Sequence, residues 1–152
     1  MVVVDKPPGL LAENPPHRAA PNLHALAEMQ FGPLVLVHRL DRDTSGVLVL
    51  ARTALANRVL SAAFREHAME KEYVAVVAAP NRLAAEGVIN ARMAPDPQHR
   101  ERMIVVAKGG QGAMTRYMVT ASTPDRQLVR LWPQTGRTHQ LRVHASKAGC
   151  PL

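Results

Sequence analysis

Two short apolar runs, residues 33–37 and 47–51, flank a polar connection in the first third of the chain. Runs of this length that are rich in Val and Leu are typical of buried strands and are too short for helices. The connection ends at Gly46, and its polar side chains are His38, Arg39, Asp41, Arg42, Asp43, Thr44 and Ser45. A loop that strands hold at both ends is fixed in place yet open to a ligand, and such loops often carry function. We therefore expect Asp41 and its flanking arginines to form part of a site.

The charge of the chain is strongly positive and unevenly distributed. Nineteen Lys and Arg stand against twelve Asp and Glu in 152 residues, which gives a net charge of +7. From Arg100 to the end there are nine Lys and Arg and two Asp and Glu. A positive face of this kind favours a polyanionic partner such as RNA through phosphate contacts and counterion release. A solvated surface that only aids solubility is the alternative.

Length and composition limit the class of the protein. A chain of 152 residues has room for one domain with a sizeable core. Its single cysteine, Cys150, excludes an intramolecular disulfide and a thiolate-rich metal site. No apolar run approaches the roughly 20 residues that a membrane span needs. We expect a cytoplasmic monomer that is not bound to a membrane.

Local signals indicate an α+β fold. Asn22 can cap a helix over residues 23–29, Thr53 one that runs to about Met69, and Thr138 a last helix that ends near Ala148. Pro15, Pro16 and Pro21 mark a loop. Short runs between Pro, Gly and Asp predict strands at 1–5, 33–37, 47–51, 71–79, 87–93, 103–107, 113–121 and 127–132. The pattern predicts a mixed, largely antiparallel sheet with two or three helices.

Four motifs resemble those of one enzyme family. His38-Arg39-Leu40-Asp41, followed by Thr44-Ser45-Gly46, resembles the first signature of the RluA-like pseudouridine synthases. Lys71-Glu72-Tyr73 has the family's Lys-x-Tyr form, and residues 135–144 (TGRTHQLRVH) resemble its second long signature. Residues 3–9 (VVDKPPG) are similar to the start of its catalytic domain. The motifs occur in the family's order and cover nearly the whole chain.

The resemblance implies an RNA pseudouridine synthase, which isomerises uridines of rRNA or tRNA without a cofactor. Asp41 matches the family's catalytic aspartate, which acts when uracil is detached from its ribose. Arg137 matches an arginine that forms an ion pair with that aspartate, and Tyr73 a tyrosine that lies against the displaced uracil. Arg39 matches an arginine that enters the RNA as the target nucleotide leaves. Further candidate phosphate contacts are Arg42, Lys71, Arg142 and Lys147.

The chemistry of the reaction suits these residue types. Breaking a base–sugar bond builds positive character on the anomeric carbon, which a fixed carboxylate can stabilise or capture covalently. Removal of a ribose proton, giving a glycal intermediate, is the alternative route. Either role needs Asp41 ionised, and an adjacent cation lowers the pKa of a carboxyl group. The arginine fork can bind a carboxylate through two hydrogen bonds, which lysine cannot do.

Each residue also has a second interpretation. Asp41 alone is typical of a turn carboxylate paired with a neighbouring arginine. Arg39 can form a salt bridge with Asp41 or Asp43 instead of entering RNA. Tyr73 can be an ordinary half-buried strand residue, and Arg137 can be a phosphate contact.

Three histidines, His38, His139 and His144, suggest a metal site. The last two are five residues apart on a predicted helix, which is a poor match to one helix face. We therefore expect structural hydrogen bonds from them and no metal. An RNA nuclease that uses His38 and His139 as acid and base is a further alternative.

The family usually continues beyond the residues that match 149–152, with a later strand that packs beneath the catalytic pair. We accordingly expect residues 1–152 to be a single catalytic domain without this continuation and without an amino-terminal accessory domain. The main alternative function is an RNA-binding module of the same fold with impaired catalysis.

Overall fold

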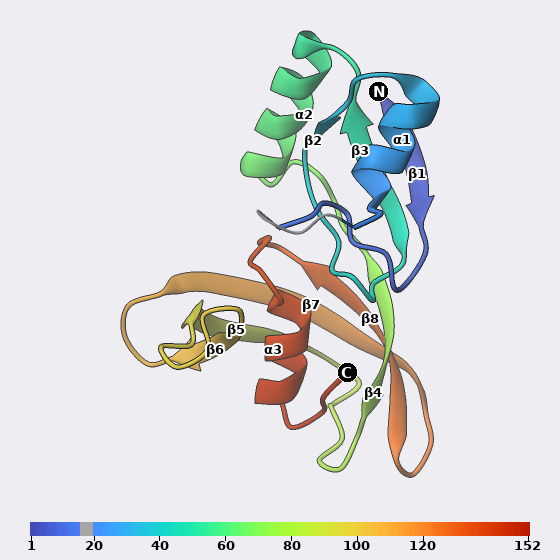
Figure 1. Ribbon diagram of the computed structural model, residues 1–152. Coiled ribbons are helices and arrows are strands. Elements are labelled where there is room, and N and C mark those ends of the chain that lie inside the picture. Colours follow the sequence, from blue (N-terminus) through green and yellow to red (C-terminus); the bar gives the residue numbers. More distant parts are fainter. Residues whose placement is uncertain (16–19) are drawn as a thin grey trace. The chain divides into compact units, whose positions relative to one another are not determined.

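The computed structural model describes residues 1–15 and 20–152, and within them it contains three helices and eight strands (Figure 1). Most of the predicted loop from Pro15 to Pro21 therefore lies outside the described residues. The chain divides into two compact units, Met1–Met69 and Glu70–Leu152. No helix in the described part is long and apolar enough to cross a membrane.

The amino-terminal unit combines three strands with two helices. In chain order these are β1 Val2–Lys6, α1 Leu23–Phe31, β2 Val35–Leu36, β3 Gly46–Ala51 and α2 Ala54–Arg65. The strands form an antiparallel sheet in the order β1-β3-β2. Leu48 and Leu50 of the central strand are fully buried, and they pack in a core with Ala12, Leu23, Ala27 and Leu34. Burial of each leucine contributes about 2 kcal/mol, so this core holds in place the strand that follows the Asp41 connection.

The two predicted caps in this unit are confirmed. The side chain of Asn22 accepts a hydrogen bond from the Ala25 N–H at 3.0 Å, and that of Thr53 accepts one from the Ala56 N–H at 3.1 Å. The prediction that α2 runs to about Met69 is wrong, because the helix ends at Arg65. His67 adopts a φ of 57°, a left-handed conformation that a helix cannot continue through.

The carboxy-terminal unit is a five-stranded antiparallel sheet with one helix. Its elements are β4 Tyr73–Ala78, β5 Glu86–Pro95, β6 Met103–Val106, β7 Gln111–Ser122, β8 Arg126–Pro133 and α3 Gln140–Lys147. The strand order is β4-β8-β7-β5-β6, and α3 contacts β5 to β8 on one face of the sheet (Figure 1). The buried core beneath α3 consists of Val77, Tyr117, Val129, Leu131, Ala145 and Cys150.

The predicted α+β class with a largely antiparallel sheet is confirmed, although the strands form two sheets. Every predicted strand is present, with ends within two residues of those expected. The predicted cap of the last helix is wrong. That helix begins at Gln140 after His139, which has a φ of 55° and makes no side-chain cap, so Thr138 does not cap it.

Candidate functional site

Asp41 lies in the loop between β2 and β3, here called the Asp41 loop (residues 37–45). The Thr44 N–H donates to the Asp41 carbonyl at 3.1 Å and closes a tight turn. The side chain of His38 fixes the start of the loop, because its Nε2 accepts from the Val49 N–H at 3.0 Å and its ring stacks on Phe64 at 4.4 Å. The loop therefore has a defined backbone, with the Asp41 side chain half-buried.

Lys6 anchors the same loop from β1, and sequence reasoning missed it. Its side chain is fully buried. Its ammonium donates three hydrogen bonds, to the carbonyls of Pro7 at 2.9 Å, Leu10 at 2.7 Å and Arg42 at 2.8 Å. The Gly9 N–H also donates to the Arg42 carbonyl at 3.0 Å. Lys6 thus ties the turn after β1 to the residue that follows Asp41. Its place in the VVDKPPG motif was the one available signal.

Burial and two carboxylates of the Asp41 loop shift the pKa of Lys6 in opposite directions. Burial lowers the pKa of the Lys6 ammonium, whereas the negative charges of Asp43 and Asp41 act in the opposite direction. No salt bridge of this ammonium is found among the described residues, and carbonyl oxygens take the place of water around it.

The arginines on either side of Asp41 are exposed. Arg42 donates through Nε to the Gly9 carbonyl at 3.3 Å and lies 3.7 Å from Asp43. An exposed pair of this kind contributes roughly 0–1 kcal/mol. The salt bridges found in the described part of the chain do not include Arg39, and its role stays a prediction.

Arg137 lies in the turn between β8 and α3, here called the Arg137 loop (residues 134–139). Gln140 organises this loop with all four hydrogen-bonding positions of its buried amide. Its Oε1 accepts from the Thr135 hydroxyl at 2.7 Å and from the Arg137 N–H at 3.0 Å. Its Nε2 donates to the Met114 carbonyl and to Thr115 Oγ1, both at 3.0 Å. In the sequence, Gln140 stood out only as part of the motif at residues 135–144. In the structure, its side chain links the Arg137 loop to β7.

Two further contacts hold the Arg137 loop. The Arg137 side chain donates through Nε to the Gly112 carbonyl at 3.2 Å. Lys71, which precedes β4, donates through Nζ to the Thr135 carbonyl at 3.1 Å, and burial lowers the pKa of its ammonium. Lys71 was predicted as a phosphate contact, and the structure gives it a bond to the backbone of the Arg137 loop.

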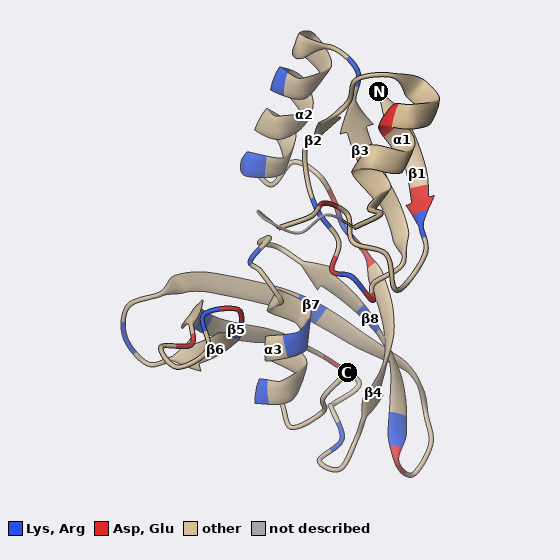
Figure 2. Cartoon of the chain, viewed as in Figure 1, with Lys and Arg blue, Asp and Glu red and all other residues tan. Residues whose placement is uncertain are grey.

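Tyr73 begins β4 as a half-buried residue and packs against the core beneath α3. Its neighbour Glu72 binds residues of β8. The Glu72 carboxylate accepts from Arg130 at 2.6 Å and from the Trp132 indole at 3.2 Å. Arg142, the last predicted site residue, is exposed on α3, which carries Lys and Arg but no Asp or Glu (Figure 2).

The structure therefore groups the predicted site residues within each unit. In the amino-terminal unit, Asp41 shares one loop with Arg39 and Arg42. In the carboxy-terminal unit, Lys71 is bonded to the loop that carries Arg137. The ion pair between Asp41 and Arg137 stays a prediction.

Replacement of Gln140 by Glu is expected to destabilise the protein by about 2–3 kcal/mol. The substitution keeps the shape of the side chain but turns the two donors that face Met114 and Thr115 into acceptors. Urea unfolding measures the change. Gln134→Glu, at an exposed position two residues before Gly136, is the matched control and should leave the free energy of unfolding nearly unchanged. Equal effects of the two variants would contradict the role of the Gln140 amide.

His144 of α3 should make the protein less stable in acid. Its ring is fully buried, Nδ1 lies 2.9 Å from Thr115 Oγ1, and Nε2 has no hydrogen-bond partner among the described residues. Burial, together with the charge of Lys147, lowers the pKa of this imidazole. Below the unfolded pKa of about 6.5, the unfolded state binds more protons than the folded state, so the free energy of unfolding falls as the pH drops toward the folded pKa.

Urea unfolding of the wild type and of His144→Gln between about pH 7.5 and 5.5 measures this dependence. The variant should lose part of the acid sensitivity, whereas His99→Gln, at an exposed position, should retain it. A wild-type slope that survives unchanged in His144→Gln would assign the acid sensitivity to other groups.

Comparisons with known proteins place these loops in context. A sequence profile described as RNA pseudouridylate synthase matches residues 1–147. Ribosomal large subunit pseudouridine synthase C of Haemophilus ducreyi is 36% identical over 158 residues, which span all of this chain and 48% of that protein. The Escherichia coli protein of the same name is 42% identical over 119 residues, or 78% of this chain and 37% of that protein.

Two solved human structures are also similar. RNA pseudouridylate synthase domain containing 4 superposes with a TM-score of 0.76 at 32% identity, and domain containing 1 with a TM-score of 0.82 at 26% identity. Each comparison covers 98% of this chain and 62% of the human chain. The chain spans about half the length, or less, of the bacterial relatives that it matches.

Proposed function

The chain belongs to the RNA pseudouridylate synthase family, and on this premise we propose that it isomerises uridine to pseudouridine in RNA. The bond between uracil N1 and ribose C1′ breaks, and a bond between uracil C5 and C1′ forms. C5 loses its proton and N1 gains one, so the composition of the RNA is unchanged and no cofactor is consumed. The relatives are named for the large ribosomal subunit, which favours rRNA over tRNA as the substrate and the cytoplasm as the place of action.

Asp41 is the proposed catalytic group. The observation that carries this assignment is the anchoring of its loop, in which the turn at Thr44 and the buried ammonium of Lys6 hold the backbone carbonyls of Asp41 and of the following Arg42. A carboxylate held in this way can stabilise or capture the positive charge that develops at C1′. It can also remove a ribose proton on the glycal route. Preorganisation of the carboxylate is needed for either route.

Arg137 and Tyr73 complete the proposed machinery. The Nε of Arg137 donates to the Gly112 carbonyl, and its two Nη nitrogens are proposed to bind the Asp41 carboxylate. The Tyr73 ring is proposed to lie against the detached uracil while the base turns. Residues 1–152 are proposed to act as one catalytic domain and as a monomer.

The RNA itself is proposed to bind through cationic side chains on both units. Arg39 and Arg42 flank Asp41, Arg142 lies on α3, and Lys71 has two ammonium protons beyond the one it donates to Thr135. Extrusion of the target base costs a few kcal/mol of unstacking, which a planar cation such as Arg39 can partly offset.

Tritium release tests the proposed function directly. Transcripts of rRNA and tRNA carrying tritium at uridine C5 are incubated with the protein, and the water, the strand length and the nucleosides are analysed. The proposal predicts tritium in the water, pseudouridine in the digest and strands of unchanged length. A binding module would hold the RNA in a salt-dependent manner without release, and a nuclease would shorten it. Either of these two results would contradict the proposal.

A further inference from the structure

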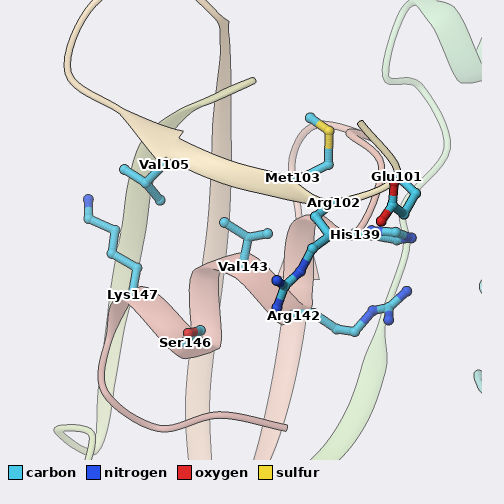
Figure 3. A pocket seen from close by; sticks show the side chains of 9 residues that line it. All are labelled: Glu101, Arg102, Met103, Val105, His139, Arg142, Val143, Ser146 and Lys147. Atoms are coloured by element: carbon cyan, nitrogen blue, oxygen red, sulfur yellow. The ribbon is translucent and has the colours of Figure 1, made fainter. Parts of the chain in front are cut away.

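A pocket of about 410 Å³ lies between β6 and α3, wholly within the carboxy-terminal unit (Figure 3). Its volume falls within the roughly 300–1,000 Å³ that is typical of small-molecule sites. It is lined by Glu101, Arg102, Met103, Val105, His139, Arg142, Val143, Ser146 and Lys147. The proposed chemistry of the Asp41 loop assigns no role to this pocket.

The middle of the pocket is apolar. Val105 pairs with Met93 across the sheet, and Met93 is fully buried, so both side chains project from the face that α3 covers. Met103 lies two residues earlier on the same face of β6. Val143 projects from α3 toward Val105 (Figure 3). These side chains form an apolar floor that stays partly open, because Val105 is 39% exposed. A flat apolar or aromatic group can cover it.

The rim of the pocket is cationic. Arg102, Arg142 and Lys147 stand against a single carboxylate, Glu101. The Lys147 ammonium donates to the Asn90 carbonyl at 2.7 Å, which leaves its charge uncompensated and two protons available. The Arg102 guanidinium forms no hydrogen bond or ion pair with any other described residue. An anion between Arg102 and Lys147 therefore gains attraction without displacing any salt bridge of these two side chains found among the described residues.

We propose that this pocket binds one unpaired nucleotide of the RNA strand, with its base on the apolar floor and its phosphates on Arg102 and Lys147. RNA is recognised chiefly through unpaired bases, which stack on aromatic rings and on guanidinium planes. RNA carries a planar base next to a phosphate. The base matches the apolar floor of the pocket, and the phosphate matches its cationic rim. An acidic peptide matches the rim but supplies no planar ring for the floor.

The location of the pocket connects it with the reaction. His139 lines the pocket and also ends the Arg137 loop, and Arg142 follows on the first turn of α3. A nucleotide in the pocket therefore contacts the helix whose Gln140 holds the Arg137 backbone. The proposal rests on the proposed function, because it takes RNA as the partner. It adds a binding point for a nucleotide other than the target uridine.

Fluorescence anisotropy with a labelled oligouridine tests the proposal. The pocket variant is Arg102→Ala/Lys147→Ala, and the control is Lys108→Ala/Arg126→Ala, which removes the same charge from exposed positions outside the pocket. For two lost phosphate contacts, the slope of log Kd against log salt should fall by about 1.4 in the pocket variant. The control should keep the wild-type slope.

A second arm tests the floor. The wild type should bind an abasic ribose-phosphate strand at least about fivefold more weakly than oligouridine, and the pocket variant should show a smaller difference. Equal weakening in the pocket and control variants would overturn the proposal. Equal binding of the abasic strand, or equally strong competition by polyglutamate, would do the same. Because binding is measured without turnover, a protein that binds in this way but releases no tritium would contradict the proposed function and leave the pocket supported.

Discussion

Asn in place of Asp41 is expected to lower the rate of pseudouridine formation by about 10⁴-fold, the scale seen when one member of a catalytic group is removed. The amide has the shape of the carboxylate but carries no negative charge for C1′ and is too weak a base for a ribose proton. The turn itself should survive, because the Asp41 backbone carbonyl, and not the side chain, accepts from the Thr44 N–H. Single-turnover tritium release from C5-labelled rRNA measures the rate.

Asp43→Asn is the matched control for this experiment. The side chain of Asp43 lies in the same loop, is 82% exposed, and forms only a weak pair with Arg42 at 3.7 Å. Its replacement removes the same charge from the same loop and should leave the rate close to that of the wild type. Thermal unfolding of both variants verifies that the fold is retained. Similar rates for Asp41→Asn and Asp43→Asn would remove Asp41 from the catalytic role.

Lys6→Met is expected to reduce the free energy of unfolding by about 2–4 kcal/mol. Methionine fills a similar length but donates no hydrogen bonds, so the carbonyls of Pro7 and Leu10 lose the bonds that Lys6 makes to them. The Arg42 carbonyl keeps its bond from the Gly9 N–H, which limits the loss. Removing the ammonium also removes the cost of burying a cation. The expected loss in the free energy of unfolding is therefore smaller than the cost of leaving three polar groups without hydrogen bonds.

Urea unfolding measures this loss, and Lys108→Met, in an exposed turn, is the control for removal of a positive charge. The Lys6 variant should also release tritium more slowly, because the backbone beside Asp41 is no longer held. If Lys6→Met were as stable and as active as Lys108→Met, the three hydrogen bonds of Lys6 would not hold the Asp41 loop.

Features of the fold that depend on local chemistry were predictable from the sequence. Asn22 and Thr53 cap helices because their side chains reach the N–H groups three residues later. The strands were recognisable because Val-rich runs lie between Gly, Pro and Asp. Their partition into two sheets was not, because it depends on pairings between distant segments, such as Tyr73 with Leu131.

The incorrect helix ends and the two missed residues have specific physical causes. His67 and His139 adopt left-handed conformations that are uncommon for residues other than glycine, so the end of α2 and the start of α3 were misplaced. Lys6 was missed because a lysine is rarely fully buried, and only the three carbonyls around it explain its burial. Gln140 was overlooked because an amide gains its importance from four partners that lie on β7 and in the Arg137 loop.

The most direct test is an experimental structure of this chain bound to an RNA that contains its target uridine. We predict that an Asp41 carboxylate oxygen lies within contact of the ribose of the extruded uridine, and that the Arg137 guanidinium binds the same carboxylate at about 2.7–2.9 Å. A complex in which the target ribose lies away from Asp41, or in which Arg137 and Asp41 face different parts of the RNA, would contradict it.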